Sequence, residues 1–484
     1  MSEFKLQNLK PENLFKNFEL LTRIPRESGN EKEVSDFLVD FGKKLNLETY
    51  QDEVNNVYII KEATKGYENR NGIVIQGHMD IVAEKEKELD FNFKTDSINL
   101  QIKDDMIYAT GTTLGADNGI AIAMAMTILE DDTIKHPRIE LLATVDEEVG
   151  MLGADKIKPE HIKGKYMINI DSEEEGVITV SCAGGKNVIV DLPINYEKVS
   201  KNKIAFKVSI EGLQGGHSGA EIHLQRANAN KLLGRLLNSI QVEYDIVSIN
   251  GGSKSNAIPR DAQALILVED KDVEKLISDI KDLEKIYKNE FSSVDSELQI
   301  NIKEIENRST QVLSKDSKGK VIEFILISPH GVQTFSNEIE DLVESSLNFA
   351  IIEQHEDKIT FLSSARSSVI SLREEICDRI VAMSKVFGGS AKIDGVYPAW
   401  EYAKDSNLEK TAVEVWKEIS GVEPKVTAIH AGLECGMLLE KLPGFEAISI
   451  GPDIMDVHTP NEHISISSTV KVWNYLLELI QRLD

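Results

Sequence analysis

The sequence predicts an α/β protein whose main domain is interrupted by an inserted α+β region. At 484 residues the chain exceeds the length at which one hydrophobic core keeps growing, so at least two domains are expected. Short apolar runs alternate with helical patterns in residues 1–185 and 396–484, which indicates buried strands between helices. Residues 186–395 instead contain alternating strands and amphipathic helices.

The composition, with 41% hydrophobic and 28% charged residues, is that of an ordinary globular protein. The net charge of −27 argues against nucleic acid and anionic membranes as partners, because both bind clustered positive charge. The sequence shows no apolar run of membrane-spanning length and no signal-peptide pattern at its N-terminus. The three scattered cysteines, Cys182, Cys377 and Cys435, do not suggest a disulfide framework. We therefore expect a cytoplasmic protein.

The strand predicted over residues 72–77 ends in His78-Met79-Asp80. A histidine at a strand end with an acid two residues later is an arrangement found at metal sites. The imidazole can coordinate an ion, and the carboxylate can hold the other ring nitrogen. A surface turn would give the same three residues, so this motif alone does not decide between the two.

A glycine-rich loop, residues 109–119, leads into an apolar, alanine-rich run that predicts a buried helix over residues 120–129. The loop places Asp117 at the first turn of this helix. An aspartate there is often a helix cap. The flanking Gly115 and Gly119 permit backbone conformations that a cap does not require, which favours a more specific role.

The strand predicted over residues 139–145 runs into the adjacent carboxylates of Glu147 and Glu148. Such a pair can divide two tasks, since one carboxylate can hold a cation while the other acts as a base on water. A solvated acidic loop is the alternative. Further apolar runs at 166–170 and 447–450 are followed by Asp171 and, after a loop, by His458.

Taken together, these motifs supply two imidazoles and three carboxylates at strand ends, a helix entrance and a loop. Ligands of α/β sheets collect at the carboxyl ends of the strands. This donor set suits a pair of zinc-like ions with one carboxylate between them. The predicted ligands are His78, Asp117, Glu148, Asp171 and His458.

The middle of the chain predicts a domain of its own, residues 186–395. Its first part has the order βαββαβ, which fits a ferredoxin-like unit. The expected elements are strands at 203–210, 244–249, 262–268 and 298–302, with helices at 226–237 and 273–291. A second, looser round follows, with helices at 320–327 and 369–387 and strands at 343–353, 358–364 and 391–393.

As a set, the motifs resemble those of the di-zinc M20 metallopeptidases, and among these the cytosolic non-specific, or aminoacyl-histidine, dipeptidases. The resemblance extends over nearly the whole chain, with the motifs in family order. It implies a zinc-peptidase-like, three-layer αβα catalytic domain with an inserted lid of two ferredoxin-like halves. The motifs are His78-Met-Asp80, Gly115-Ala-Asp117-Asn-Gly119, Asp146-Glu-Glu148-Val-Gly150, Asp171-Ser-Glu-Glu174 and His458-Thr-Pro-Asn-Glu462.

The resemblance also implies roles for the five predicted ligands. Asp117 would bridge two divalent ions, His78 and Asp171 would complete one ion site, and Glu148 and His458 would complete the other. Zn²⁺ is expected, with Co²⁺ and Mn²⁺ as alternatives. The catalytic residues would be Glu147, as general base, and Asp80, which orients His78. The peptide bond after Asp117 would be cis.

In the lid, the resemblance singles out a Gly-Gly-His-Ser-Gly motif whose His217 would polarise the scissile carbonyl. Asn256 resembles an asparagine that helps to hold the substrate carboxylate. Simpler relatives place an arginine soon afterwards, but residues 262–268 contain none. Arg366 could supply the bidentate carboxylate contact instead.

His430, Gly432 and Glu434 resemble a loop that lines the substrate pocket, although a glycine turn before a helix also has a purely structural use. The expected function is hydrolysis of dipeptides. An N-acyl-amino-acid amidohydrolase and an inactive peptide-binding protein are the alternatives. The expected partner is a small peptide substrate, and both a monomer and a homodimer agree with the sequence.

Overall fold

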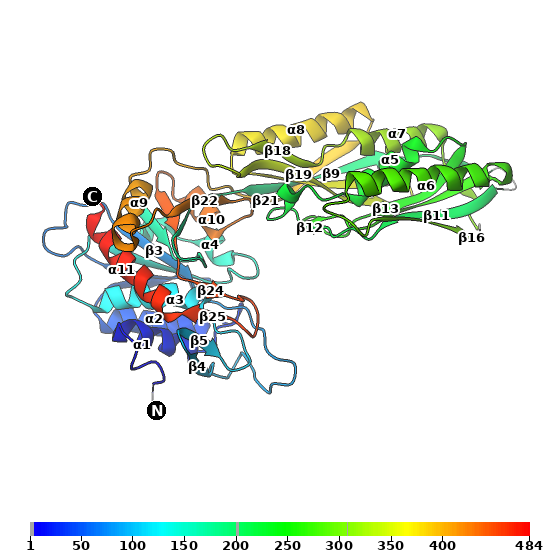
Figure 1. Cartoon of the computed structure of the whole chain (residues 1–484). Coiled ribbons are helices and arrows are strands. Elements are labelled where there is room, and N and C mark those ends of the chain that lie inside the picture. The colour runs from blue at the N-terminus through cyan, green and yellow to red at the C-terminus, as the bar shows by residue number, and fades with distance from the viewer. Residues whose placement is uncertain (1–3, 200–202, 307) are drawn as a thin grey trace. The chain divides into compact units, whose positions relative to one another are not determined.

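A computed structural model of the protein describes residues 4–199, 203–306 and 308–484. The chain divides into two compact units (Figure 1). Unit 1 comprises Met1–Ser181, Tyr402–Ala428 and Leu433–Asp484, and unit 2 comprises Cys182–Glu401 and Ile429–Gly432. The sequence-based boundaries at 185/186 and 395/396 did not include this return of residues 429–432 to unit 2.

Unit 1 is built on an eight-stranded sheet with the order β1-β2-β6-β3-β7-β23-β8-β22. Its middle strands β6, β3, β7 and β23 run parallel to one another. Every residue of β2, β3, β6 and β7 is buried, so both faces of the sheet's centre are covered. The strands are β1 (Glu48–Gln51), β2 (Val57–Lys61), β3 (Ile73–His78), β6 (Ile139–Thr144), β7 (Tyr166–Asn169), β8 (Val177–Cys182), β22 (Lys425–Ile429) and β23 (Glu446–Ser449).

The remaining elements of unit 1 are mostly helices, with two short strand pairs beside them. The helices are α1 (Glu12–Thr22), α2 (Lys32–Lys44), α3 (Ala116–Glu130), α4 (Leu152–Lys156), α9 (Asn407–Ser420), α10 (Glu434–Lys441) and α11 (Ile466–Arg482). The strands are β4 (Leu100–Lys103), β5 (Met106–Ala109), β24 (Ile454–Met455) and β25 (His463–Ser465), which form a separate small sheet.

Helices lie on both faces of the large sheet. Successive side chains of a strand point to opposite faces, so two neighbouring residues of β3 identify the two layers. A Cβ on Gly77 would lie 2.6 Å from Cβ of Ala121, which places α3 on that face. Gln76 points to the other face and donates to Glu434 at the start of α10. The predicted three-layer αβα fold is confirmed.

Unit 2 contains a nine-stranded sheet with the order β16-β11-β15-β13-β19-β20-β9-β21 and with β18 beside β19. Among the described residues, the neighbouring strands of this sheet pair antiparallel. The strands are β9 (Gly184–Pro193), β11 (Lys203–Glu211), β13 (Tyr244–Gly251), β15 (Ala262–Glu269), β16 (Gln299–Ile305), β18 (Gly331–Phe335), β19 (Val343–Gln354), β20 (Lys358–Ser367) and β21 (Ser390–Tyr397). The helices are α5 (Ala229–Ser239), α6 (Val273–Glu290), α7 (Lys315–Ile327) and α8 (Ile370–Val386).

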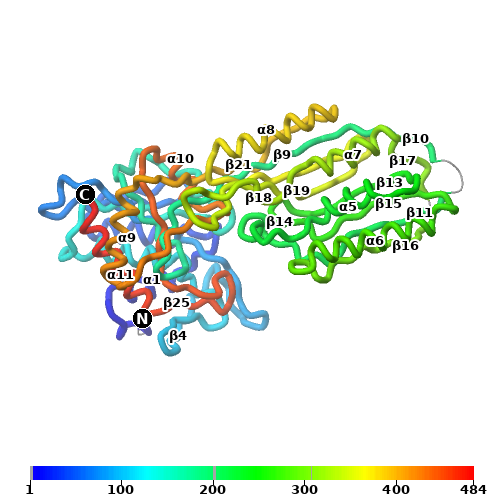
Figure 2. The backbone as a smooth tube through the Cα atoms, turned by 45° about the horizontal axis from the view of Figure 1, so that its top comes forward, coloured from blue at the N-terminus to red at the C-terminus, as the bar shows by residue number. Residues whose placement is uncertain are grey.

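The sheet consists of two ferredoxin-like halves placed edge to edge (Figure 2). In the first half, the strands lie side by side in the order β16-β11-β15-β13, and α5 and α6 are the crossovers. By their sequence order, these are the fourth, first, third and second strands of the half. Strands β9, β19, β20 and β21 have the same order when they are read from the opposite edge of the sheet, with α7 and α8 as crossovers. The prediction of two halves is confirmed, but it missed β9. The first strand of the second half precedes the whole first half, which is therefore nested inside the second.

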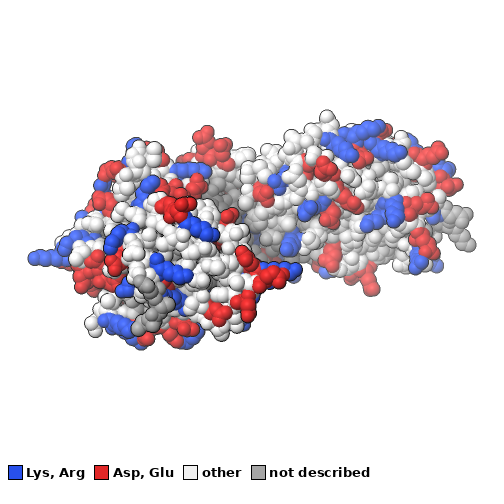
Figure 3. Space-filling view, turned by 60° about the horizontal axis from the view of Figure 1, so that its bottom comes forward, with Lys and Arg blue, Asp and Glu red and all other residues white. Residues whose placement is uncertain are grey.

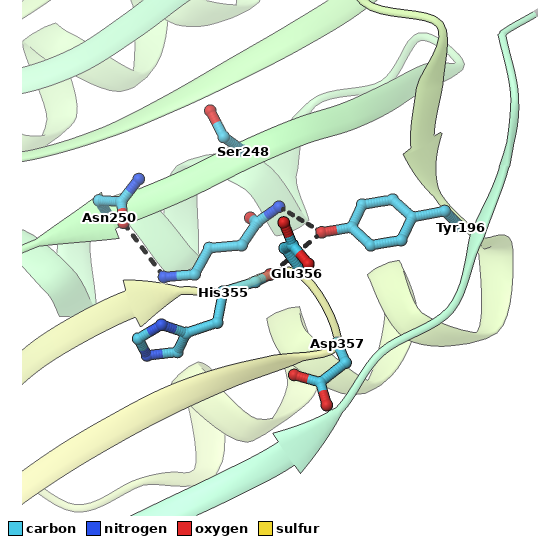
Figure 4. Close-up of a pocket in the computed structure, with 7 residues that line it drawn as sticks. Tyr196, Ser248, Asn250, His355, Glu356 and Asp357 are labelled. Atoms are coloured by element: carbon cyan, nitrogen blue, oxygen red, sulfur yellow. Dashed lines mark hydrogen bonds between the residues drawn. The ribbon is translucent and has the colours of Figure 1, made fainter.

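The two halves meet where β13 pairs with β19 through Gly251 and Ile352. Beyond this pair the amide of Gln354 bridges the strands: Oε1 accepts from Ile249 N at 2.9 Å, and Nε2 donates to Val247 O at 3.0 Å. A polar pocket lies over this junction (Figure 4). Its lining residues are Tyr196, Ser248, Asn250, Gln354, His355, Glu356 and Asp357.

Acidic and basic side chains are interspersed on the face of the molecule drawn in Figure 3. Within the part of the chain that the structure describes, no helix has both the length and the apolar character needed to cross a membrane.

Candidate metal centre and active site

The first group of predicted ligands surrounds His78, the last residue of β3. Its Nε2 lies 3.0 Å from Oδ1 of Asp117 and 3.4 Å from Oδ1 of Asp171. Its Nδ1 lies 3.4 Å from Oδ1 of Asp80. Parallel strands β3 and β7 end at the same edge of the sheet, and this brings His78 and Asp171 together.

The second group surrounds His458, in the loop before β25. Its Nε2 lies 3.2 Å from Oδ2 of Asp117 and 3.0 Å from Oε2 of Glu148. The two carboxylate oxygens of Asp117 thus face different histidines. His78, Asp117 and Glu148 each place one potential ligand atom within 4.8 Å of the ligand atoms of the other two.

The backbone around Asp117 departs from a regular helix. Gly115 has a φ of +73°, in the left-handed region that favours glycine. Asp117 and Asn118 have non-helical backbone angles although they stand in the first turn of α3. The Asp117–Asn118 peptide bond is cis, as the resemblance implies.

Asp80 connects His78 to the loop that carries the two adjacent glutamates. It is fully buried, and its oxygens accept from the backbone N–H of Glu147 at 3.1 Å and of Glu148 at 3.2 Å. Ser28 Oγ donates to the same carboxylate at 2.8 Å. Burial acts to raise the pKa of Asp80, but hydrogen bonds led by that from His78 lower it overall. Asp80 is therefore ionised, and it contacts both His78 and the backbone of the loop that carries Glu147 and Glu148.

The cluster carries more negative than positive charge. Burial, together with the charges of Asp171, Glu434 and Glu148, raises the pKa of Glu147 to about 9, and His78 only partly offsets this. Burial likewise raises the pKa of Asp171 to about 6 and that of Glu434 to about 7. Divalent cations would favour the ionised carboxylates. The imidazole and carboxylate donors therefore fit a site for such ions.

Glu434, at the start of α10, lies in unit 1. It is 1% exposed, its Oε2 accepts from Gln76 Nε2 at 2.6 Å, and its Oε1 has no hydrogen-bond partner among the described residues. Gln76 also accepts from Asn169 at 2.5 Å, so a buried polar network lies below the end of β3. The other predicted substrate-binding residues, His217, Asn256, Arg366, His430 and Gly432, all belong to unit 2.

His217 and Asn256 are held together by a short ladder between β12 (Gly216–His217) and β14 (Ala257–Ile258). Ser218 N donates to Asn256 O at 2.8 Å. The Nδ1 atom of His217 accepts from Gly219 N and Ala220 N at 3.3 and 3.1 Å, which places the ring proton of neutral His217 on Nε2. Burial, with a contribution from Arg366, lowers the pKa of His217.

Arg366, in β20, lies opposite Ser346 of β19 and is 7% exposed. Its Nη1 donates to Tyr397 Oη at 2.6 Å, and no carboxylate among the described residues forms an ion pair with it. Ser346 Oγ is 2.7 Å from Nε2 of His430. Burial first, and Arg366 second, lower the pKa of His430 to about 3. An arginine beside neutral histidines, with no carboxylate partner, is a potential anion-binding group. Gly432 lies against the Tyr397 ring.

Two buried residues that contact the Asp117 loop were not predicted from the sequence. Glu462 accepts from backbone N–H groups of residues 114–117, and Arg26 donates to backbone carbonyls of residues 79, 80 and 115. Glu462 does stand in the His458 motif. Arg26 has no local signal, because its partners are distant in sequence.

Comparison with known proteins identifies the family. A family model described as peptidase family M20/M25/M40 matches residues 74–482. The cytosol non-specific dipeptidase of Escherichia coli K12 is 34% identical over 485 residues, covering 100% of this chain and 99% of that protein. The crystal structure of aminoacylhistidine dipeptidase from Vibrio alginolyticus matches with a TM-score of 0.94 and 33% identity, covering 100% and 99%. This chain therefore belongs to peptidase family M20/M25/M40.

Proposed function

We propose that this protein is a metal-dependent dipeptidase that hydrolyses the peptide bond of free dipeptides. The observation that carries the proposal is the arrangement around Asp117, whose two oxygens face His78 and His458, each with a further carboxylate beside it. The names of the Escherichia coli and Vibrio alginolyticus relatives, both dipeptidases, support the same activity.

In this proposal Asp117 would hold two divalent ions, His78 and Asp171 would complete one set of donors, and Glu148 and His458 would complete the other. Zn²⁺ is the expected metal, with Co²⁺ and Mn²⁺ as alternatives. When bound, such ions supply Lewis acidity for the scissile carbonyl and lower the pKa of water.

Glu147 acts as the general base. It removes a proton from the attacking water and returns that proton to the amine that leaves. Among the described residues, the carboxylates that pair with His78 and His458 are those of Asp80, Asp117, Asp171 and Glu148, which leaves Glu147 for proton transfer. Asp80 positions it, because this buried carboxylate accepts from the Glu147 backbone N–H and contacts His78.

Unit 2 supplies groups that bind the substrate, and in this sense it is the proposed lid. The Nε2–H of neutral His217 donates to the oxygen of the scissile carbonyl, where negative charge develops. Arg366 binds the carboxylate of the dipeptide, with Asn256 and His430 as further polar contacts. The location proposed is the cytoplasm, as the name of the Escherichia coli relative suggests.

The experiment that tests the function is hydrolysis of a substrate panel by metal-stripped protein reloaded with zinc, cobalt or manganese. The panel contrasts unblocked dipeptides with N-acetyl amino acids. We expect metal-restored cleavage of the dipeptides alone. Cleavage of the acylated set alone would indicate an amidohydrolase, which the relatives do not favour, and inactivity of every metal form would indicate a peptide-binding protein.

A further inference from the structure

Two buried charged residues contact the loop that carries Asp117. Glu462 is 2% exposed and follows His458 in the same loop, while Arg26 is 1% exposed and lies between α1 and α2. Both residues bond to backbone atoms of the Asp117 loop. These bonds indicate that the two residues act on the backbone conformation of the loop.

Glu462 binds a row of four consecutive backbone N–H groups. Oε2 accepts from Leu114 at 2.7 Å and Gly115 at 2.9 Å, and Oε1 accepts from Ala116 at 2.8 Å and Asp117 at 3.3 Å. The first N–H groups of a helix have no partners within that helix, and they attract negative charge. Here a side chain from near the other end of the chain supplies that charge.

Arg26 binds carbonyl groups from two segments. Nη1 donates to Met79 O at 2.8 Å, and Nη2 donates to Gly115 O at 2.6 Å. The guanidinium therefore joins the segment after His78 to the segment before Asp117. Burial lowers the pKa of Arg26 to about 10, partly offset by Glu462, Asp80 and Asp117, so the group stays charged at neutral pH.

The glycines on either side of Asp117 are explained by this contact. A Cβ at Gly115 would lie 2.7 Å from Nη2 of Arg26, and a Cβ at Gly119 would lie 2.5 Å from the same atom. Both distances are too short for unbonded atoms. The two glycines thus leave room for the guanidinium, in addition to the backbone freedom that Gly115 requires.

We propose that Arg26 and Glu462 act as a clamp that holds residues 114–117 in place, so that the two oxygens of Asp117 face His78 and His458 before any metal binds. Both are positioning residues. The clamp also couples the two groups of ligands: Arg26 joins the Asp117 loop to the His78 segment, and Glu462 joins it to the His458 loop. The inference rests on the proposed function only in taking Asp117 as a metal ligand.

The test compares Glu462→Gln and Arg26→Lys with a matched control, Glu140→Gln. A glutamine has one accepting oxygen in place of two, and a lysine lacks the two-pronged donor geometry of arginine. Glu140 is also buried and also accepts from backbone N–H groups, those of Lys163 and Gly164 at 3.0 and 3.1 Å. It stands near the opposite end of the sheet strands from the metal ligands.

Two quantities are measured on the full chain. One is the affinity for Zn²⁺ and Co²⁺ in competition with a chromophoric chelator, and the other is amide hydrogen exchange of residues 114–117 in the metal-free protein. We expect both clamp variants to bind metal roughly 10- to 100-fold more weakly and to exchange these amides faster. We expect Glu140→Gln to change neither quantity.

Wild-type affinity and wild-type exchange in the folded clamp variants would overturn the proposal. It would also be overturned if both clamp variants failed to fold without metal while Glu140→Gln folded, because the pair would then serve overall stability. The proposed function can fail independently of the clamp. If the wild-type protein bound no metal, the proposed dipeptidase function would be refuted. The amide exchange of residues 114–117 in the wild type and the variants would still show whether Arg26 and Glu462 hold this loop in place.

Discussion

At the scale of single residues, Asp117 is the centre of the candidate site because its two oxygens face two histidines from opposite ends of the sequence. His78 precedes it in the chain and His458 follows by several hundred residues, yet both rings lie within 3.2 Å of its carboxylate. A carboxylate in this position can bridge two ions, whereas a simple helix cap would bond only to its own helix.

Glu147→Gln tests the general base. The substitution preserves size but removes the group that accepts a proton from water. We expect kcat for dipeptides to fall by roughly 10²- to 10⁴-fold, while metal content stays at the wild-type level because Glu147 is not a proposed ligand. Steady-state kinetics and metal analysis of the same preparation check this. Retention of most of the activity would refute the assignment.

Arg366→Lys tests the carboxylate-binding group. Lysine keeps the charge but loses the planar fork, and a charge-assisted hydrogen bond contributes about 1.5–3 kcal/mol. A loss of binding free energy of this size should lower kcat/KM for dipeptides roughly 10- to 100-fold. We expect little change in kcat/KM for dipeptide amides, because they lack the carboxylate.

The matched control is Arg373→Lys. Arg373 is also a buried arginine of unit 2, but it pairs with Glu374 and donates to Tyr397 O. Its substitution should leave the ratio of dipeptide to dipeptide-amide hydrolysis unchanged. Equal effects of both substitutions on this ratio would count against Arg366 as the carboxylate-binding residue.

At the scale of elements, unit 2 shows how one sheet is assembled from two similar halves. Within the described part of the chain, Gly251 and Ile352 form the one backbone pair between them, and beyond it the side-chain amide of Gln354 hydrogen-bonds to the backbone of β13. Because an amide side chain has the same donor and acceptor groups as a peptide bond, it continues the hydrogen bonding after the strands separate.

His330, between α7 and β18, makes the stability of unit 2 depend on pH. Its Nδ1 accepts from Phe349 N and Asn228 Nδ2, and burial, aided by Lys231, lowers its pKa to about 4. The unfolded value is about 6.5. Between these two values the unfolded chain binds more protons, so the stability that neutral His330 provides is present above pH 6.5 and is lost as the pH falls towards 4.

The measurement is urea unfolding of wild type, His330→Gln and a control, His223→Gln, at pH 7 and pH 5. His223 is exposed. We expect wild type and the control to lose up to about 1.4 kcal/mol per pH unit more than His330→Gln over this range. Equal losses in all three proteins would show that His330 does not titrate as described.

At the scale of the whole molecule, unit 1 is assembled from three chain segments. Four of the five proposed ligands come from the first segment, and His458 comes from the last. Metal that binds all five would therefore connect segments separated by the insertion. An ion that binds only the folded state increases the free energy of unfolding. The metal should therefore stabilise unit 1, which contains all five proposed metal-ligating residues.

Removal of metal by a chelator should accordingly lower the melting temperature of unit 1. The stabilisation lost is about 4 kcal/mol when free metal stands a thousandfold above its Kd. Differential scanning calorimetry of the stripped and reloaded protein checks this, and unit 2 supplies the internal control. A transition of unit 2 that shifts as far as that of unit 1 would contradict the prediction.

Much of the fold and the candidate site was predictable from the sequence because the signals are local. A buried strand is a short apolar run, and His78, Glu148 and Asp171 are recognised by their places just after such runs. The ferredoxin-like order of the first half follows from alternating strands and amphipathic helices in sequence. The family motifs then assign roles to these residues.

Only the tertiary structure showed the contacts between segments far apart in the chain. Glu462 is separated by 348 residues from Leu114, whose N–H it binds, and β9 pairs with β20 and β21 across the whole nested half. Hydrogen bonds of this kind leave no periodic pattern, because each depends on where the fold brings a distant backbone group. The sequence by itself predicted most of the strands and the five proposed ligands, because those signals are local. Only the tertiary structure showed that the buried Arg26 and Glu462 contact the loop that carries Asp117, because those contacts join residues far apart in the chain.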